Sequence, residues 1–523
     1  MTAARTEARS APAGAPVVDP SDPAAVRRAH ATRLAGRLGP AAVPGLLMAV
    51  VGLAGADRPV LSWDEVATAD VAQRSAGQIW RLLHTVDAVF APYYLFMHAW
   101  TSVVGLTVLD LRVPSIAAMA GAVAVTGEVG RRLFGPVVGL VAGTVLVLLP
   151  SMSHYAIEAR PYAFACLFSI AALLLLDRLL DHPRRSRLLA YGSALVALGL
   201  CHIVALTVLG AHLSIAGLRS LRARSWRSLT VCAVAVAGAL VILSPLAWLG
   251  LRQRHEQLYW VPALTGRSLS AFPGGLVGSS AGALLLLAFV AVAIWRPVPH
   301  RIDMILAAVL PIASVAVASL VGPSFWVPRY LLIVLPPIAI LAAVGPEPLA
   351  VTRRPIRPLA VAARGAALLA VCALSIAAVV PGQLAVRRPT AKNGGDYRSA
   401  ASIIETRQQP GDDIIYTPSE RTLRAGMDYY LRRDPGRPRD VLLERSAASS
   451  ASLKATEYAD AADRVASAPR IWLLVGGWHS DPTTVRKQLR PLLRLDYTRV
   501  QLWHVKWATL ALFRRRSQTV QPQ

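Results

Sequence analysis

Two apolar runs joined by a short polar turn decide the fold of this chain. Residues 136–176 read PVVGLVAGTVLVLLPSMSHYAIEARPYAFACLFSIAALLLL. Each run is long enough to cross a bilayer as an α-helix. The turn between them holds His154, Glu158 and Arg160, which are costly beside hydrocarbon unless they pair or bind something. The stretch therefore predicts a helical membrane protein with polar groups collected at one end of its helices.

The composition of all 523 residues supports this reading. Hydrophobic residues make up 54% and charged residues 16%, with a mean hydropathy of +0.46, which excludes an ordinary water-soluble enzyme. Lys and Arg number 55 against 30 Asp and Glu, but most lie in short clusters between apolar runs. This distribution excludes a nucleic-acid partner and indicates contact with anionic lipid on the cytoplasmic side. The four cysteines lie in apolar stretches without a CxxC pair, so neither a disulfide framework nor a zinc site is predicted.

Alternation between basic and weakly charged connections predicts a polytopic α-helical protein with about eleven transmembrane helices. The predicted spans are the apolar runs 40–56, 113–130, 136–153, 161–180, 188–201, 203–218, 228–249, 276–295, 303–322, 330–350 and 359–380. Five connections carry sixteen arginines and are assigned to the cytoplasm. An odd number of spans puts the N-terminus in the cytoplasm and the C-terminus outside the cell membrane.

These spans divide the chain into three predicted regions. Residues 1–38, rich in Ala, Pro and Arg, are expected to form a disordered cytoplasmic tail. Residues 39–380 form the transmembrane domain, in which 57–112 is the first outer loop and Ala91–Thr107 a juxtamembrane or re-entrant helix. The composition of 381–523 is polar and predicts a small extracytoplasmic α/β domain. Its strands are expected around Asp412–Tyr416, Ile471–Val475, Thr498–His504 and Thr509–Phe513, with a helix at Asp396–Gln408.

Four separate regions place rare polar residues at the predicted outer face. Asp64 and Glu65 follow the first span, where a carboxylate acts as a general base, holds a cation, or only ends a helix in water. The turn His154–Tyr162 either forms an internal ion pair or binds a ligand. Arg329 either holds a phosphate or extends to lipid headgroups. His202 lies in a tight outer turn, where histidine is more often structural than catalytic.

The agreement among these regions favours a shared function, because independent helix ends would not need to meet at one face. A single lipid-facing polar cavity explains them together. It would offer carboxylates to deprotonate a hydroxyl or bind a cation, and arginine to bind a phosphate. This combination suits transfer from a phosphate-linked donor embedded in the bilayer.

Several short motifs resemble those of bacterial GT-C glycosyltransferases, in particular the actinobacterial relatives of protein O-mannosyltransferases and of the lipid A aminoarabinose transferase. They are Ser62-Trp63-Asp64-Glu65, Pro92-Tyr93-Tyr94 with Trp100 and Gly105, Leu111-Arg112-Val113-Pro114-Ser115, Gly130-Arg131-Arg132-Leu133-Phe134-Gly135, Glu158-Ala159-Arg160-Pro161-Tyr162 and Pro328-Arg329-Tyr330. The resemblance covers residues 40–345 in order and spacing. It implies a GT-C fold and an enzyme that moves a sugar, with inversion, from a polyprenyl-phosphate donor to a glycan, lipid or protein hydroxyl outside the plasma membrane.

The resemblance also implies roles for individual residues. Asp64 would be the catalytic base, with Glu65 beside it. The acceptor-binding or second acids would be Glu158 and Asp87; the donor phosphate and lipid would contact Arg329, Arg160 and Tyr330; and the remaining cavity residues would be His84, Tyr94, His154, Tyr162 and His202. Glu158 stands in a Glu-Ala-Arg run rather than the Asp-x-Asp triplet of the family, so no cofactor is certain and a divalent metal, magnesium or manganese, stays open.

Two other functions compete with a transferase of mannose or a pentose such as arabinose. A membrane transporter or lipid flippase would use the outer carboxylates for coupling, and charged groups should then continue through the spans as a relay. They do not, because the remaining acids lie at predicted inner ends: Glu128, Asp177, Asp181, Asp303 and Glu347. A membrane anchor for an outer binding module would leave the outer carboxylates unexplained. The sequence therefore favours the enzyme.

Overall fold

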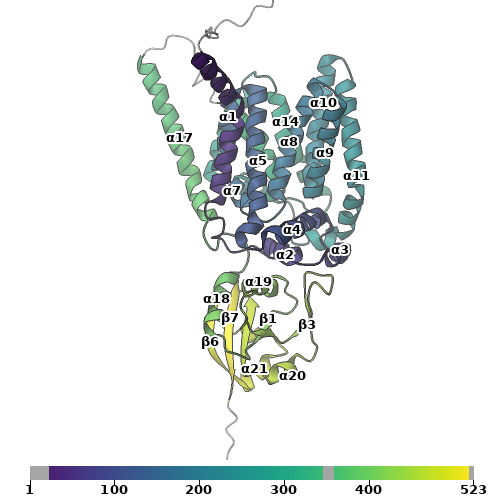
Figure 1. Ribbon diagram of the computed structural model, residues 1–523, viewed down its shortest axis with the longest axis vertical. Helices are drawn as coiled ribbons and strands as arrows, with labels where there is room; N and C mark the ends of the chain where they lie inside the picture. Colours follow the sequence, from purple (N-terminus) through teal and green to yellow (C-terminus); the bar gives the residue numbers. More distant parts are fainter. Residues whose placement is uncertain (1–22, 346–357, 517–523) are drawn as a thin grey trace, which may run out of the picture.

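Long helices form a bundle that stands on a small α/β domain (Figure 1). The computed structural model describes residues 23–345 and 358–516. The helices of the bundle and its connections are α1 (Pro23–Leu53), α2 (Trp63–Ala72), α3 (Ala76–Thr85), η1 (Ala88–Phe90), α4 (Ala91–Val104), α5 (Val108–Phe134), α6 (Pro136–Leu148), α7 (Pro150–Ala156), α8 (Tyr162–Asp181), α9 (Arg185–Cys201), η2 (Ile203–Thr207), α10 (Val208–Ala223), α11 (Arg227–Leu258), α12 (Gly266–Val277), α13 (Ser280–Ile294), α14 (Arg301–Val321), η3 (Pro328–Val334), α15 (Leu335–Val344) and α17 (Pro358–Val386).

Every predicted apolar run lies in helical structure as far as the chain is described. The count of eleven spans, however, is not shown. In the described part of the chain, five helices are long and apolar enough to cross a membrane, or up to seven if each of two bent helix pairs counts as one span. Helix α1 begins at Pro23, so the predicted disordered tail over residues 1–38 is helical from that point, and residues 1–22 lie outside the described part. Helix α4 lies across the end of the bundle with α2 and α3 (Figure 1).

The two bent helix pairs meet at their breaks. Helices α6 and α7 bend by 70° where Pro150 begins α7, because proline cannot continue the hydrogen bonding of the preceding helix. Helices α12 and α13 bend by 90° next to Gly278, whose φ of +79° is left-handed. A Cβ atom on Gly278 would lie 2.8 Å from the backbone nitrogen of Ser151, so only glycine fits this contact. The bends place both breaks at the end of the bundle near α2.

Ion pairs join four helices at the end of the bundle that is farther from the α/β domain. Arg132 at the end of α5 contacts Asp177 of α8 at 2.5 Å and also pairs with Asp181. Arg219 of α10 contacts Asp177 at 2.6 Å and Asp303 of α14 at 3.5 Å. These acids were predicted at inner helix ends, and the network gives them a structural role that does not require a charge relay.

The C-terminal region folds around one five-stranded sheet of mixed direction. Its elements are α18 (Tyr397–Arg407), β1 (Asp413–Tyr416), α19 (Thr422–Tyr430), β2 (Arg439–Asp440), β3 (Leu443–Arg445), β4 (Thr456–Glu457), α20 (Ala461–Ala466), β5 (Arg470–Gly476), η4 (Pro482–Thr484), α21 (Arg490–Leu495), β6 (Tyr497–Val505) and β7 (Ala508–Arg515). The strand order is β2-β1-β5-β7-β6; β1 is parallel to β2 and β5, whereas β7 is antiparallel to β5 and β6. All four strands expected from the sequence are present.

One hydrophobic cluster crosses from the bundle into the α/β domain. It contains Val66 of α2 and Tyr94 of α4 together with Met427 of α19, Trp472 of β5 and Leu510 of β7. All of these side chains are buried. Helix α19 therefore packs directly on α2, and the α/β domain forms one wall of whatever site α2 contributes to.

Candidate active site

Helix α2 presents Asp64 in its first turn. Ser62 caps the helix: its hydroxyl accepts from the backbone N–H of Glu65, and the Glu65 carboxylate accepts from the backbone N–H of Ser62. This reciprocal cap fixes where the helix begins. Asp64 then lies in the first turn of α2, at the positive end of the helix dipole. Its side chain is about one quarter exposed.

Glu65 points the other way, into a fully buried ion pair. Its two carboxylate oxygens accept from Nε and Nη2 of Arg112 on α5, both at 2.8 Å, and both side chains have no exposed surface. Lys392, in the segment after α17, adds a second cation at 3.1 Å. Burial would raise the pKa of Glu65, but the two cations hold it well below its usual range. This network joins α2, α5 and the segment that leads into the α/β domain.

The turn between α7 and α8 is held against α2 by the same network. The backbone N–H of Ala159 donates to the Glu65 carboxylate at 3.0 Å, and the Ala159 carbonyl accepts from the hydroxyl of Thr68 at 3.1 Å. Lys392 also donates to the carbonyl of Ile157 at 2.5 Å. Because the turn is fixed on both sides, Glu158 and Arg160 project from it in defined directions.

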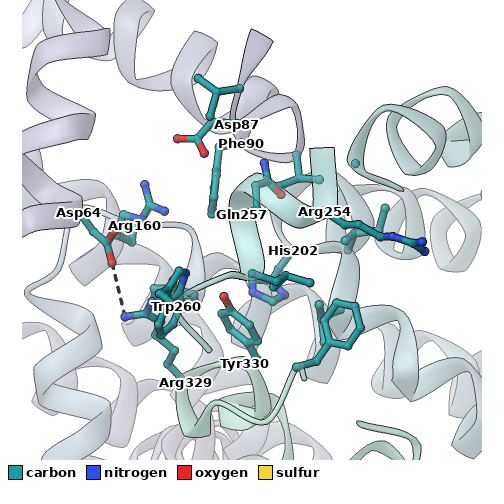
Figure 2. A pocket seen from close by; sticks show the side chains of 18 of the residues that line it. Asp64, Asp87, Phe90, Arg160, His202, Arg254, Gln257, Trp260, Arg329 and Tyr330 are labelled. Atoms are coloured by element: carbon teal, nitrogen blue, oxygen red, sulfur yellow. Dashed lines mark ion pairs between the residues drawn. The ribbon is translucent and has the colours of Figure 1, made fainter. Parts of the chain in front are cut away.

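Arg329 is the ion-pair partner of Asp64. Its Nη1 lies 3.4 Å from Oδ2 of Asp64, the ion pair drawn in Figure 2. The guanidinium is surrounded by aromatic rings, with its carbon 4.8 Å from the centre of Trp260 and 5.6 Å from that of Tyr162. Arg160 stacks on Phe90 at 4.0 Å and lies beside Asp64 in the same view.

These side chains surround a cavity of about 460 Å³. It is lined by helix ends and loops of the bundle and by one residue of the α/β domain. The lining residues that carry charge, hydroxyl or imidazole groups are Asp64, Asp87, Tyr94, Arg160, Tyr162, His202, Arg254, Tyr259, Arg329, Tyr330 and Arg421. Its volume is within the range of small-molecule sites.

A smaller cavity of about 280 Å³ shares part of its lining with the larger one. Asp64 and Arg329 line both cavities, as do Tyr259, Trp260 and Arg421. The remaining lining residues of the smaller cavity are Ser62, Trp63, His154, Tyr155, Glu158, Lys392 and Asn393. The Asp64–Arg329 pair is thus accessible from both cavities.

Four buried nitrogen atoms of residues that line the larger cavity have no hydrogen-bond partner in the described part of the chain. They are Nε of Arg160, Nε of Arg329, Nδ1 of His202 and Nε2 of Gln257. Buried polar atoms without partners are rare in native proteins and require an explanation. Two of the four belong to guanidinium groups, so an anion is the ligand that their chemistry suits best.

Burial and neighbouring charge alter the pKa values in the smaller cavity. Burial would raise the pKa of Glu158, but Lys392 and the hydrogen bond from His154 lower it to about 2. Burial lowers the pKa of Lys392 to about 8, although Glu65 opposes the change. Both groups are therefore charged near neutral pH, and the Nε2 atom of His154 lies 3.2 Å from the Glu158 carboxylate.

The structure brings together most of the residues singled out from the sequence. Eight line the larger cavity, namely Asp64, Asp87, Tyr94, Arg160, Tyr162, His202, Arg329 and Tyr330. His154 and Glu158 line the smaller one. Glu65 and His84 line neither: Glu65 is buried beside Arg112, and His84 is an exposed residue of α3 whose ring contacts the carbonyl of Trp80. Both differ from expectation because the sequence does not show which way a side chain points.

Sequence reasoning missed Trp260, Lys392 and Arg421. One signal was available for Lys392, because the chain has only four lysines and this is the first of them. A lysine directly after the last apolar run, in an arginine-rich chain, marks a position where a flexible ammonium is needed. Nothing local distinguishes Arg421 from the other arginines of its domain.

The carboxylates of the site do not form a chelating set. Asp64 faces Arg329, Glu158 faces His154 and Lys392, and Asp87 accepts from the hydroxyl of Tyr94 at 2.8 Å. Among the described residues, no group of three or more His, Cys, Asp and Glu side chains is arranged to hold a metal ion. The donor set present therefore does not fit the divalent ion that the resemblance left open.

Neither a protein-family model nor a curated protein matches the sequence. Solved structures do match. The structure of ArnT from Cupriavidus metallidurans bound to undecaprenyl phosphate is 16% identical, covers 92% of this chain and 99% of that chain, and has a TM-score of 0.56. The apo structure of the same protein is 16% identical, covers 91% of this chain and 97% of that chain, and has a TM-score of 0.55. An archaeal oligosaccharyltransferase, AglB from Archaeoglobus fulgidus, is 10% identical, covers 92% of this chain and 74% of that chain, and has a TM-score of 0.45. The likeness to ArnT confirms the expected GT-C fold.

Proposed function

We propose that this chain, which has the fold of GT-C glycosyltransferases, transfers a sugar from a polyprenyl-phosphate donor to a hydroxyl of a cell-envelope acceptor. The observation that carries the proposal is the Asp64–Arg329 pair, which lines two cavities. A carboxylate beside an arginine supplies a base for a hydroxyl and a partner for a phosphate at the same point. The match to ArnT bound to undecaprenyl phosphate supports the donor class.

In the proposed reaction the larger cavity holds the donor and the smaller one the acceptor. Asp64 takes the proton of the acceptor hydroxyl while the acceptor oxygen attacks the anomeric carbon. The bond between that carbon and the phosphate oxygen breaks on the opposite face, so the sugar configuration inverts. The electron pair leaves with the lipid phosphate, whose charge Arg329 and Arg160 neutralise. We propose mannose or arabinose as the sugar and the outer face of the plasma membrane as the place of reaction.

Transfer of radiolabelled sugar tests the proposal directly. Membranes containing the protein are incubated with envelope extract and either polyprenyl-phosphate mannose or polyprenyl-phosphate arabinose, and membranes without the protein serve as the control. Label that enters the extract only when the protein is present identifies both the reaction and the donor. If no member of a wider donor panel is used, and the lipid itself instead changes leaflet, the protein is a flippase.

Arg329→Gln is expected to raise the KM for the donor more than it lowers kcat. Hydrogen bonds to a charged group contribute about 1.5–3 kcal/mol, which corresponds to roughly 10- to 100-fold in affinity. Arg252→Gln is the matched control, because Arg252 also stacks on a tryptophan, Trp248, at 3.7 Å but lines neither cavity. An unchanged donor KM in Arg329→Gln would remove this residue from the phosphate site.

A further inference from the structure

The α/β domain contributes one side chain to both cavities. Arg421 precedes α19 and is exposed, and it lines the larger and the smaller cavity together with Asp64 and Arg329. It is the single lining residue of either cavity that comes from beyond residue 393. A catalytic cavity in the bundle thus includes a cation supplied by the other domain.

The position of Arg421 is determined by how α19 is attached to the bundle. The Tyr430 hydroxyl accepts from the backbone N–H of Leu61 at 3.1 Å, next to the cap of α2. The Tyr429 hydroxyl donates to the carbonyl of Leu106 at 2.8 Å. Leu423 and Met427 are buried in the cluster shared with α2 and α4. With its far end and its buried face both fixed, α19 directs its first residues toward the cavities.

The other charged groups of the smaller cavity already lie beside groups of opposite charge. Asp64 is paired with Arg329. Lys392 is paired with Glu65, which Arg112 also contacts, and its charge lowers the pKa of Glu158. Glu420, the carboxylate next to Arg421 in sequence, instead accepts from the backbone N–H and hydroxyl of Thr422 at 2.8 and 2.6 Å. Within residues 23–345 and 358–516, Arg421 has no ion pair, so the cavity carries one unmatched positive charge.

We propose that Arg421 binds an anionic group, a phosphate or a carboxylate, on the acceptor. This inference rests on the proposed function and names its acceptor class: a molecule that presents a hydroxyl to Asp64 and a negative charge to Arg421. A guanidinium suits this role because its planar donors hold either anion with two parallel hydrogen bonds. The α/β domain then selects the acceptor, while the bundle holds the donor and the base.

Calorimetric titration of the purified full-length protein in detergent tests this with three probes. Glucose 6-phosphate represents an anionic acceptor, glucose its neutral counterpart, and undecaprenyl phosphate the donor lipid. The wild type should bind glucose 6-phosphate at least ten-fold more tightly than glucose. Arg421→Gln should abolish that preference and change the affinity for undecaprenyl phosphate by less than two-fold. Arg445→Gln, which removes the same charge from an exposed position of the same domain outside both cavities, should behave as wild type.

Three results would overturn the proposal. The first is a wild type that shows no preference for the phosphorylated sugar, and the second is an Arg421→Gln variant that keeps the preference. The third is an Arg421→Gln variant that binds undecaprenyl phosphate more weakly, which would assign the arginine to the donor. Because binding does not require turnover, a failure to detect sugar transfer would end the proposed function without changing the outcome of this titration.

Discussion

Asp64→Asn is expected to lower kcat for sugar transfer by about 10²- to 10⁴-fold, the usual contribution of a positioned general base. Asparagine keeps the shape of the side chain and its place at the start of α2 but cannot accept the acceptor proton. Donor binding should persist, because Arg160 and Arg329 remain. The measurement is initial-rate transfer at saturating donor and acceptor, with the amount of folded protein determined for each variant.

Asp70→Asn is the matched control for this loss. Asp70 lies on the same helix and pairs with Arg74 at 2.7 Å, away from both cavities. We expect the rate per folded molecule to stay within about two-fold of wild type, since Asp70 lines neither cavity. Equal rates for wild type and Asp64→Asn would show that the acceptor proton leaves by another route.

Glu65→Gln is expected to reduce the free energy of unfolding by about 3–5 kcal/mol, the cost of breaking a buried ion pair by removing one partner. Arg112 would keep its charge in a fully buried place without its carboxylate partner, and Lys392 would lose one of the two carboxylates near it. The measurement is chemical unfolding of the detergent-solubilised variant against wild type. Asp64→Asn, one residue away, should unfold almost as wild type does, because its partly exposed pair stabilises little.

The difference in the free energy of unfolding between wild type and Glu65→Gln should depend on pH, because the pKa of Glu65 is lowered in the folded protein. A carboxyl whose pKa is lower in the folded state stabilises the fold above its ordinary pKa of about 4.3, and this stabilisation is lost as the pH falls below that value. Glutamine does not titrate, so the difference in the free energy of unfolding between wild type and Glu65→Gln should become smaller in acid. A variant that keeps its stability yet loses transfer would instead return Glu65 to the catalytic role expected from the sequence.

Helices and strands could be predicted because their signals are local. The apolar runs each form helices, and the strands at 413–416, 470–476 and 508–515 lie where alternating or continuous apolar residues were read. The breaks inside the runs were not predicted. The bend at Gly278 depends on its contact with Ser151, which is distant in the sequence.

The dipeptide Asp64-Glu65 shows where sequence reasoning about the site reaches its limit. Both are carboxylates at the start of one helix, so they were expected to act together. Their roles separate only because Arg112 and Lys392, far along the chain, approach one of them and Arg329 the other. Charge type and spacing predict that a site exists, whereas the partner of each group depends on the tertiary fold.

The cluster shared by the bundle and the α/β domain also affects the order in which the fold can be completed during synthesis. Val66 and Tyr94 are made more than 400 residues before Leu510 and Leu512 of β7, with which they share the cluster. At 5–20 residues per second, about 20 to 90 s of translation separate these partners. The sheet behind α19 is therefore completed only after β7 has been made, and a nascent chain that stops before β7 lacks this part of the support for the cavity wall.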